Sequence, residues 1–548
     1  MQKESNRRSN FIVQGGILAI TGIISRIIGL VYRVPLQKTI GDAGMGYYSA
    51  AFQIYSIMLI ISSYSLPVAV SKLVSARAAK GQYRNARRVY HGALLFATIT
   101  GTATCLIVLL GADTLAGPAM NMPKCAIALR MLGPTLLIVA LMGVFRGYFQ
   151  GLGTMMPTAI SQLVEQIVNA IVSVAAAIYL WEYGSKVATI LKDEAYQSAW
   201  GAAGGTIGTG AGALAGLIVL IVALLIFRRR MAKNVRLSED TRVDSYAKVF
   251  RIILITALPV ILSTTIYNIS DTLDQAIFNY VMDIKGMANI KAEYWGIYST
   301  KYRVLTNVPI ALANALCSSM MPSLTACIER GEAKLARHKV AVAMRFNMII
   351  SFPCAVGLAV LGKPIIAMLF SGEVDIPAML LRVGSCSVIF YSLSTLSNGV
   401  LQGIDKMRVP VRNAAIALVL HLGILYLTIG VLDWGLYGVV VACVAFALIM
   451  CILNWLSIKK YLHYRQEVRR TFIIPLISSL IMGAIVWLTY FLTSKALNDI
   501  LSVAISIIFG AVVYFVVLLV LRGVKESEIR SLPGGNIIAT IGRMLHLL

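Results

Sequence analysis

The sequence predicts an all-α polytopic membrane protein with about fourteen transmembrane helices. We expect two pseudo-symmetric six-helix lobes around a central cavity, followed by two C-terminal helices. Three observations predict this fold: the apolar composition, the alternation of loop charges and an internal duplication. Of the 548 residues, 58% are apolar and 13% are charged, with a mean hydropathy of +0.79, whereas soluble domains have about 45–50% apolar and about 25% charged residues. This composition excludes a soluble enzyme and a disordered chain.

The predicted helices follow from the lengths of the apolar stretches. About fourteen stretches between polar breaks reach the roughly 20 apolar residues that a membrane-spanning helix needs, which is more than a barrel strand uses. They lie near residues 11–38, 46–71, 89–111, 125–149, 157–181, 200–227, 250–281, 294–321, 337–361, 378–401, 410–431, 434–456, 472–493 and 499–521.

These spans also predict the domain organisation. Residues 1–10 form a cytoplasmic N-terminus, and helices 1–6 form an N-lobe over residues 11–227. A basic cytoplasmic linker over 228–249 leads to a C-lobe of helices 7–12 over 250–456. Residues 457–548 hold helices 13 and 14 and a cytoplasmic C-terminal tail.

Loop charges predict the orientation. The chain carries 49 Lys and Arg against 24 Asp and Glu, a net charge of +25. Basic residues gather in the cytoplasmic loops of membrane proteins, so this balance requires no nucleic-acid partner. Basic and non-basic loops alternate along the chain, as an even number of spans requires, and both termini are expected in the cytoplasm. The basic loops are 72–88, 228–251, 329–345, 405–412 and 459–470, and the balanced or acidic ones are 113–124, 182–194, 283–293 and 363–375.

The orientation places individual residues on opposite sides of the membrane. We expect Arg84 and Arg242 to face the cytoplasm, and Glu182 and Asp375 to face outward.

An internal duplication repeats sequence features about 250 residues apart. The stretch that begins at Arg146 and ends at Pro157 returns between Asn398 and Pro410. The matches occur in the same order along both copies, and the offset spans an even number of helices, so the copies have the same topology. Such parallel repeats are found in transporters that work by alternating access. Further pairs are Leu129-Arg130 with Leu381-Arg382, Gly46-Tyr-Tyr-Ser49 with Gly296-Ile-Tyr-Ser299, and Pro67 with Pro322.

Two arginines in the first predicted helix are candidate substrate ligands. Arg26 lies fifteen residues after Phe11, which is about 22 Å along a helix, and Arg33 follows on the same face. An ionisable side chain inside a membrane is costly unless it faces a cavity or a partner. Guanidinium groups suit phosphate and carboxylate, so these arginines favour an anionic substrate. The alternative is a structural role in which they pair with an acid such as Glu165.

Other charged residues are candidates for more than one role. Asp271 and Asp274 share a face of the seventh helix and are candidates for charge balance, cation binding or proton transfer, as is Glu165. Lys301 and Arg303 open the eighth helix and are further candidate substrate ligands. His421 in an apolar helix, and the cysteines, are expected to be structural. No Walker motif, nucleophile elbow, metal triad or CxxC occurs, so neither an enzyme nor a cofactor or metal is expected.

The motifs resemble those of MurJ-type lipid II flippases, and in particular the stage V sporulation protein B and YtgP-like branch of polysaccharide biosynthesis proteins. These belong to the multidrug/oligosaccharidyl-lipid/polysaccharide (MOP) exporter superfamily. The resemblance covers nearly the whole chain. It rests on the helix count, on Ser25-Arg26-Ile-Ile-Gly29 in the first helix, and on Tyr302-Arg303 … Pro309 … Met321-Pro322-Ser323-Leu324.

The resemblance implies a flippase that moves undecaprenyl-pyrophosphate-linked saccharides, lipid II first among them, to the outer leaflet of a bacterial cytoplasmic membrane. The family's first-helix arginine corresponds to Arg26, and its eighth-helix arginine to Arg303. A second first-helix arginine is replaced by Tyr32, with Arg33 one step along, and residues 53–71 carry no charge. Sodium-site residues cannot be placed, so Na⁺, H⁺ or the membrane potential remain open as driving forces.

Several functions stay open at this point. The leading hypothesis is a lipid II flippase that acts as a monomer on a lipid-linked oligosaccharide within membrane lipids. The others are export of another lipid-linked polysaccharide unit, and a cation-coupled multidrug antiporter centred on acids such as Glu165, Asp271 and Asp274. A non-transport scaffold is disfavoured, because buried arginines would cost it stability without return.

Overall fold

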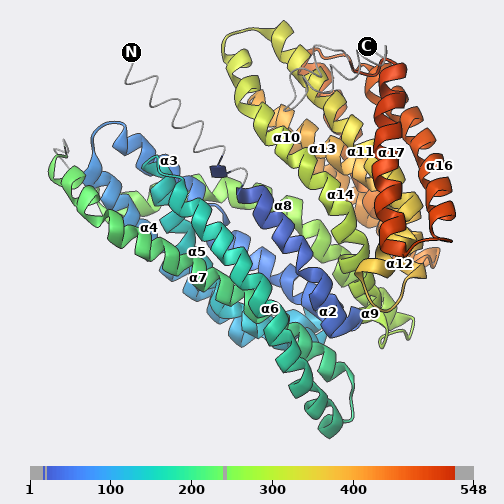
Figure 1. Cartoon of the computed structure of the whole chain (residues 1–548). Coiled ribbons are helices and arrows are strands. Elements are labelled where there is room, and N and C mark those ends of the chain that lie inside the picture. Colours follow the sequence, from blue (N-terminus) through green and yellow to red (C-terminus); the bar gives the residue numbers. More distant parts are fainter. Residues whose placement is uncertain (1–16, 19–20, 239–242, 525–548) are drawn as a thin grey trace. The chain divides into compact units, whose positions relative to one another are not determined.

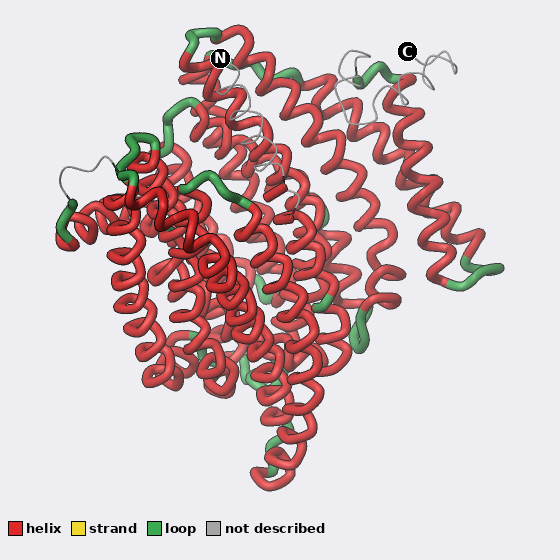
Figure 2. The backbone as a smooth tube through the Cα atoms, turned by 60° about the vertical axis from the view of Figure 1, so that its left-hand side comes forward, coloured by secondary structure: helices red, strands yellow, loops and turns green. Residues whose placement is uncertain are grey.

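The computed structural model describes residues 17–18, 21–238 and 243–524, and within these ranges it consists of helices, turns and loops without strands (Figure 2). Residues 21–31 are helical and precede the first element with defined bounds. The other elements are α2 (Arg33–Leu59), η1 (Ile60–Tyr64), α3 (Leu66–Ala78), α4 (Tyr83–Thr114), η2 (Leu115–Ala119), η3 (Pro123–Cys125), α5 (Ala126–Gly151), α6 (Met156–Leu191), α7 (Ala195–Arg236), α8 (Tyr246–Ile284), α9 (Lys291–Gly296), η4 (Ile297–Tyr302), α10 (Arg303–Glu329), α11 (Ala333–Leu369), α12 (Asp375–Gly384), α13 (Cys386–Gly403), α14 (Arg408–Tyr426), η5 (Leu427–Val431), α15 (Gly435–Leu462), η6 (Arg469–Ile473), α16 (Ile474–Thr493) and α17 (Asp499–Val520) (Figure 1).

The described helices are long and apolar enough for a multi-pass membrane protein. Ten helical stretches among the described residues qualify as candidate spans, or eleven if α12 and α13, which bend by 49°, count as one. The first stretch, Thr21–Ala78, has 58 residues and covers residues 21–38 of the first predicted span and all of the second. The spans predicted at 250–281 and 294–321 fall on α8 and on α9 to α10, which are not among these stretches, so fewer of the described helices qualify than the fourteen predicted. The all-helical prediction is confirmed. The predicted spans fall on helix over most of their described length, with short breaks such as the turns at Ser65 and Ser385.

The polypeptide divides into two compact units, Met1–Gly296 and Ile297–Leu548. This division differs from the predicted lobes, because α8 and α9 fall in the first unit. They do so because α9 packs against α2, and α8 packs against α3 and α4. The predicted lobe boundary at 228–249 concerns which parts of the protein move together, and it stays a prediction. The contacts between helices place α8 with the helices that precede it.

The internal duplication is visible in the helix boundaries. Helix α5 ends at Gly151 and α13 at Gly403, and the next helices begin at Met156 and Arg408, so both offsets are 252 residues. Gly81 and Gly331, 250 residues apart, both adopt a left-handed conformation, with φ of 69° and 73°. These turns come directly before α4 and α11, which begin at Tyr83 and Ala333.

Small residues hold α6 and α7 close together in the first unit. A Cβ added to Gly204, Gly208 or Gly212 of α7 would lie 2.4, 2.1 or 2.5 Å from an atom of α6. Glycines four residues apart share a helix face and allow two membrane helices to approach closely. The two helices have 36 and 42 residues, about 54 and 63 Å at 1.5 Å per residue. The predicted loop 182–194 is therefore wrong in extent, because helix continues through Leu191.

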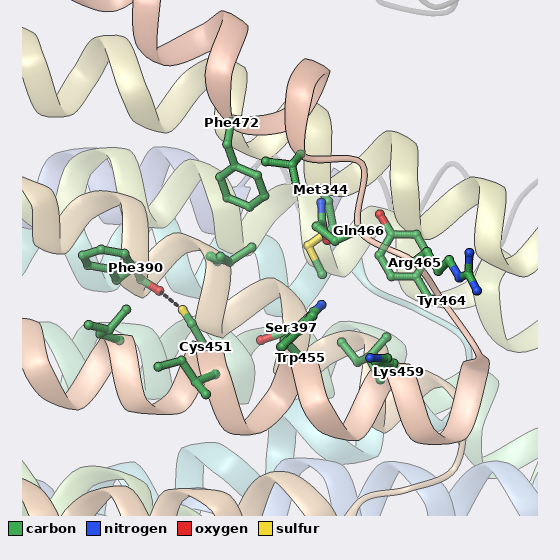
Figure 3. Close-up of a pocket in the computed structure, with 15 residues that line it drawn as sticks. Met344, Phe390, Ser397, Cys451, Trp455, Lys459, Tyr464, Arg465, Gln466 and Phe472 are labelled. Atoms are coloured by element: carbon green, nitrogen blue, oxygen red, sulfur yellow. Dashed lines mark hydrogen bonds between the residues drawn. The ribbon is translucent and has the colours of Figure 1, made fainter.

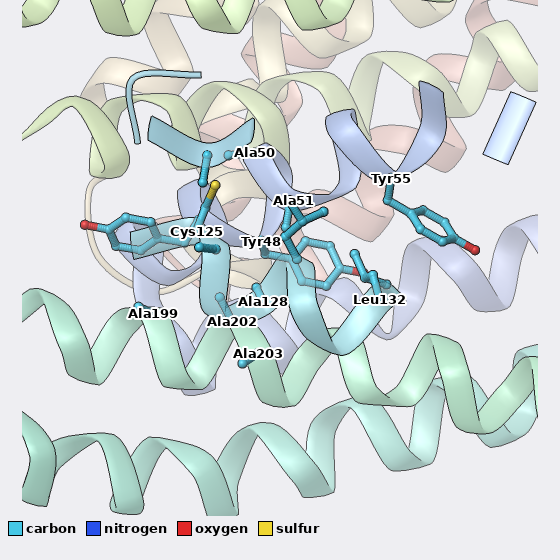
Figure 4. Close-up of a cluster of buried hydrophobic side chains, with 14 of the residues drawn as sticks. Tyr48, Ala50, Ala51, Tyr55, Cys125, Ala128, Leu132, Ala199, Ala202 and Ala203 are labelled. Carbon is cyan, nitrogen blue, oxygen red and sulfur yellow. The ribbon is translucent and has the colours of Figure 1, made fainter. Parts of the chain in front are cut away.

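The core of the first unit is also built from small residues. Ala50, Ala51, Ala128, Ala202 and Ala203 are fully buried and bring α2, α5 and α7 together (Figure 4). In a membrane, where lipid tails are as apolar as the core, association depends on such close packing and on hydrogen bonds rather than on hydrophobic burial.

The basic loops of the first unit contact one another. Arg77 forms an ion pair with Asp244 at 2.8 Å, and Lys248 contacts the same carboxylate at 2.7 Å. Arg88 donates to the Asp244 carbonyl at 3.1 Å and lies over the Tyr246 ring. The loops 72–88 and 228–251, predicted on one membrane face, are thus joined here. Arg242 lies outside the described residues.

The balanced loops of the first unit form a separate group. Lys124 pairs with Asp193, which joins the loops 113–124 and 182–194. Asn121 donates to Asp283. Lys291 donates to Asp283 and to the Asn121 carbonyl, each at 2.6 Å, which adds the loop 283–293. Loops predicted on the same side of the membrane therefore contact one another, as the alternation of charge requires.

In the second unit, too, basic loops contact basic loops, and the balanced loop makes its own contacts. Arg345 pairs with Glu467, which joins the basic loops 329–345 and 459–470. Lys363 pairs with Asp375 at 2.7 Å within the balanced loop 363–375. Helices α16 and α17, the predicted appendix, pack against each other and against α11 (Figure 1).

Candidate functional site

An ion pair lies inside the helical bundle of the first unit. Arg146 of α5 contacts Glu165 of α6 at 2.7 Å and donates to the Ser161 hydroxyl at 3.0 Å. The two charged side chains are only 14% and 21% exposed. Close packing keeps them there, because Gly212 of α7 fits against the Glu165 carbonyl. Arg146 therefore neutralises the acid that the sequence offered as a structural partner for Arg26 and Arg33.

Arg146 begins the repeated stretch 146–157 but is not among the site residues that the sequence predicts. A usable signal was present: Arg146 lies in one predicted apolar span, and Glu165 is the only charged residue of the next predicted span, 157–181. At the 252-residue offset of the repeat, Asn398 corresponds to Arg146, Asn413 to Ser161 and Ala417 to Glu165, so the second copy has no charge at these positions. Asn398 accepts from Asn454 at 2.7 Å, and Asn413 donates to Asn454 at 3.0 Å. The duplication thus preserved a polar cluster while its charge was changed.

Arg26 has the opposite environment. It lies in the helical residues 21–31, and its side chain is exposed. Within the part of the chain that the structure describes, Arg26 has no ion-pair or hydrogen-bond partner. Gly29, one turn further along, approaches α6 closely enough that its Cβ would lie 3.4 Å from the Gln166 side-chain oxygen. The helix therefore packs on α6 beside Arg26, while the arginine itself remains open.

Arg33 lies at the first residue of α2 and is half-buried. Its Nε is buried without a hydrogen-bond partner among the described residues. The hydroxyls of Tyr32 and Tyr48 lie 2.9 Å apart beside it. The two predicted arginines therefore differ: Arg26 is exposed, whereas Arg33 is partly buried and has a donor, its Nε, without a partner among the described residues.

Lys301 is fully buried in η4. Its ammonium donates to the carbonyl oxygens of Ser371 and Glu373 at 2.8 and 2.7 Å. These contacts hold a loop of the second unit, so in this conformation Lys301 acts as a structural anchor. Its predicted role as a substrate ligand stays a prediction.

Arg303 lies at the start of α10 and lines a small cavity of about 60 Å³. Tyr298, Asn307 and Tyr391 line the same cavity. The guanidinium carbon is 5.9 Å from the centre of the Tyr298 ring, at the outer limit of a cation–π contact. The Tyr302 hydroxyl donates to the Gly384 carbonyl at 3.0 Å. The cavity is thus lined by aromatic rings and one cation.

The two aspartates of α8 have different environments. Asp274 is buried, whereas Asp271 is partly exposed, and both make polar interactions. Gln275 beside them is fully buried, and neither of its amide atoms has a hydrogen-bond partner among the described residues. Asn279, one turn further along, donates to the Met120 carbonyl at 2.7 Å. A polar stripe therefore follows the buried face of α8.

The remaining candidates have structural surroundings. His421 is buried, and its Nδ1 lies 2.9 Å from the Ala442 carbonyl oxygen. The described cysteines are free thiols. Among the described residues no group of three or more His, Cys, Asp or Glu side chains is arranged to hold a metal ion.

Comparison with known proteins agrees with the resemblance seen in the motifs. The family model for "Polysaccharide biosynthesis protein" matches residues 12–328, more than half of the chain, and a MatE model matches residues 303–427. The lipid II flippase MurJ of Bacillus subtilis (strain 168) is 27% identical over 519 residues, 90% of this chain and 92% of that protein. Stage V sporulation protein B of the same strain is 25% identical over 539 residues, 96% and 98% of the two chains.

Solved structures show the same fold. The lipid II flippase MurJ in an inward closed conformation aligns with a TM-score of 0.66 at 16% identity, over 91% of this chain and 97% of that one. An inward-facing multidrug resistance MATE family transporter of the MOP superfamily aligns with a TM-score of 0.63 at 17% identity, over 83% and 98%. The chain belongs to the polysaccharide biosynthesis protein family, and its fold is that of MurJ and the MATE transporters of the MOP superfamily.

Proposed function

We propose that this protein translocates an undecaprenyl-pyrophosphate-linked saccharide, with lipid II as its substrate, from the inner to the outer leaflet of a bacterial cytoplasmic membrane. The proposal includes alternating access, a monomeric protein and both termini in the cytoplasm. It is supported by the similarity to the MurJ flippase of Bacillus subtilis over 90% of the chain. The grouping of basic loops with basic loops supports the topology.

The observation that carries the proposal is the exposed, unpartnered guanidinium of Arg26 in an apolar helix. A charge at such a place is costly unless it meets water, a partner or a ligand. Arg146, by contrast, has the environment expected of a structural arginine, because it is mostly buried and forms an ion pair with Glu165. Arg26 has no such partner among the described residues, so we assign it to the substrate's pyrophosphate.

An anion is the ligand that such a site favours. The planar guanidinium fork donates two parallel hydrogen bonds to phosphate oxygens and stays charged at every physiological pH. Arg33 adds a buried Nε donor that has no partner among the described residues. In the second unit, taken by itself, Arg303 is a separate candidate cation beside aromatic rings. The antiporter hypothesis depends instead on the acids of α8, and we assign Asp271 and Asp274 to charge balance or ion coupling.

The test compares the effect of replacing Arg26 with the effect of replacing the structural arginine, Arg146. Arg26→Ala should abolish lipid II translocation while the protein accumulates normally in the membrane, because the lost charge-assisted contact is worth about 1.5–3 kcal/mol, or at least roughly tenfold in affinity. Arg26→Lys should retain partial activity, since it keeps the charge without the fork.

The matched control is Arg146→Ala, which should lower accumulation because it leaves Glu165 unpaired. Growth and membrane level are scored separately in cells that depend on this protein. Full translocation by Arg26→Ala, at a normal membrane level, would remove the proposed role of this arginine.

A further inference from the structure

The second unit contains a cavity of about 580 Å³ that the proposed transport function does not use. It lies between α11, α13, α15, the loop 463–468 and η6, and it opens along exposed helix faces. Its lining is mostly apolar. The lining residues that matter for its chemistry are Leu448, Trp455, Lys459, Tyr464, Arg465 and Gln466 (Figure 3).

One face of α15 forms a wall of this cavity, and the wall changes from apolar residues at one end to a charged residue at the other. The lining positions 448, 451, 452, 455, 458 and 459 recur at helical spacing and end at Lys459. From Leu448 to Lys459 the wall is about 16 Å long at 1.5 Å per residue. That length matches one leaflet of a hydrocarbon core about 30 Å thick. Figure 3 places Phe390 and Cys451 toward one end, and Lys459, Tyr464 and Arg465 toward the other.

The polar end contains unused hydrogen-bond donors. Tyr464 is 4% exposed, yet its hydroxyl has no partner in the described part of the chain, and the Gln466 amide nitrogen is likewise buried without a partner. Leaving buried polar groups unpaired costs about 1–3 kcal/mol each. Burial raises the pKa of the Tyr464 hydroxyl to about 12, so this group is a donor at neutral pH.

The charge at this end is positive. Lys459 and Arg465 are exposed at the rim. The nearby acid, Glu467, is already paired with Arg345 and lies 3.8 Å from Arg470. These ion pairs fix the loop that carries Tyr464, Arg465 and Gln466, so the donors are held in place rather than free to turn toward solvent.

We propose that this cavity is a binding site for an anionic glycerophospholipid of the leaflet at the basic end of the bundle. One acyl chain lies along the apolar wall from Leu448 to Ile458, and the phosphate meets Lys459, Arg465 and the donors of Tyr464 and Gln466. The wall is one leaflet long, which suits an acyl chain and not a much longer polyisoprenoid. The inference is independent of the substrate proposed above.

The test uses fluorescence of Trp455, which lines the cavity. The full-length protein in zwitterionic detergent is titrated with phosphatidylglycerol or phosphatidylcholine carrying bromine on one acyl chain. Bromine quenches tryptophan on contact, and the Trp455→Phe variant isolates the signal of this residue from the other five tryptophans. We expect saturable quenching by phosphatidylglycerol at a concentration at least roughly tenfold lower than for phosphatidylcholine, because phosphatidylcholine has no net charge.

Charge variants locate the headgroup. Lys459→Gln and Arg465→Gln should each weaken phosphatidylglycerol binding about tenfold and leave phosphatidylcholine unchanged, and Tyr464→Phe, which keeps the ring, should weaken it by a smaller factor. Lys460→Gln removes a neighbouring exposed charge that does not line the cavity and should have no effect.

Three results would overturn the proposal. The first is equal quenching by both lipids, which would show ordinary lipid contact. The second is insensitivity to Lys459→Gln and Arg465→Gln. The third is displacement of the brominated lipid by undecaprenyl phosphate at a lower concentration than by unlabelled phosphatidylglycerol, which would assign the cavity to a polyisoprenoid.

Discussion

Gly46 and Gly296, which occupy equivalent positions in the two repeats, meet at the crossing of α2 and α9. A Cβ on Gly296 would lie 1.7 Å from the Asp42 carbonyl oxygen and 2.9 Å from the Gly46 nitrogen. A Cβ on Gly46 would lie 1.9 Å from the Ala292 carbonyl oxygen. No other residue type fits either position, so the two glycines set how closely α2 and α9 approach each other.

The crossing should be disrupted by any side chain at position 296. Gly296→Val should lower the thermal unfolding midpoint of the purified protein and slow translocation, because overpacking costs about 1–3 kcal/mol and the neighbouring atoms are backbone. The control is Gly357→Ala in α11, where a Cβ meets nothing within 4 Å and Ala is the better helix former. An unchanged midpoint in Gly296→Val would mean that this crossing does not stabilise the first unit.

The Arg146–Glu165 pair should behave as a structural unit. Arg146→Ala leaves a partly buried carboxylate unpaired, which costs at least about 1–3 kcal/mol, so the membrane level of the protein should fall. Arg146→Ala combined with Glu165→Gln should restore accumulation, because it removes the orphaned charge. Quantitative immunoblots of membranes measure both. If the double variant accumulated no better than the single one, the pair would not be the reason for the loss.

Crosslinks should show which parts of the protein move together. Asn121→Cys with Asp283→Cys joins the predicted N-lobe to the predicted C-lobe at positions whose side chains contact each other. If the repeats rock about a boundary at 228–249, this crosslink should stop translocation, and reduction should restore it. Lys124→Cys with Asp193→Cys lies within the predicted N-lobe and is the matched control.

Both pairs are made in a background without native cysteines, and lipid II translocation is measured before and after reduction. Normal transport with residues 121 and 283 joined would favour movement at the boundary between Gly296 and Ile297.

Asp244 should contribute stability that depends on pH. Hydrogen bonds from Lys248 and Arg77 lower the pKa of this carboxyl group below its ordinary value. Its folded-state pKa lies below its unfolded-state value, so the contribution is complete above the unfolded pKa of about 3.9 and is lost as the pH falls through the lowered pKa.

Asp244→Asn should therefore lower the unfolding midpoint near neutral pH and flatten its decline in acid. Glu182→Gln, at an exposed glutamate, serves as the control. An acid decline in Asp244→Asn as steep as in the natural protein would assign the pH dependence to other groups.

The fold was predictable because its signals are local. Apolar length fixes where helices lie, and loop charge groups the loops by side, as the contacts of Arg77 with Asp244 and of Lys124 with Asp193 show. The site was predictable only in part, because the partner of a charged side chain depends on how helices pack. Glu165 pairs with Arg146 rather than with Arg26, and Lys301 anchors a loop. Neither contact follows from spacing along one helix.

Translocation of lipid II by the purified protein is the most direct test of the proposed function. Proteoliposomes that contain fluorescent lipid II are treated with a membrane-impermeant quencher, which reports the lipid exposed on the outer face over time. We expect protein-dependent movement between leaflets that Arg26→Ala abolishes and that Arg146→Ala combined with Glu165→Gln retains. Movement no faster than in protein-free liposomes, together with cation-coupled export of an organic cation by the same preparation, would contradict it.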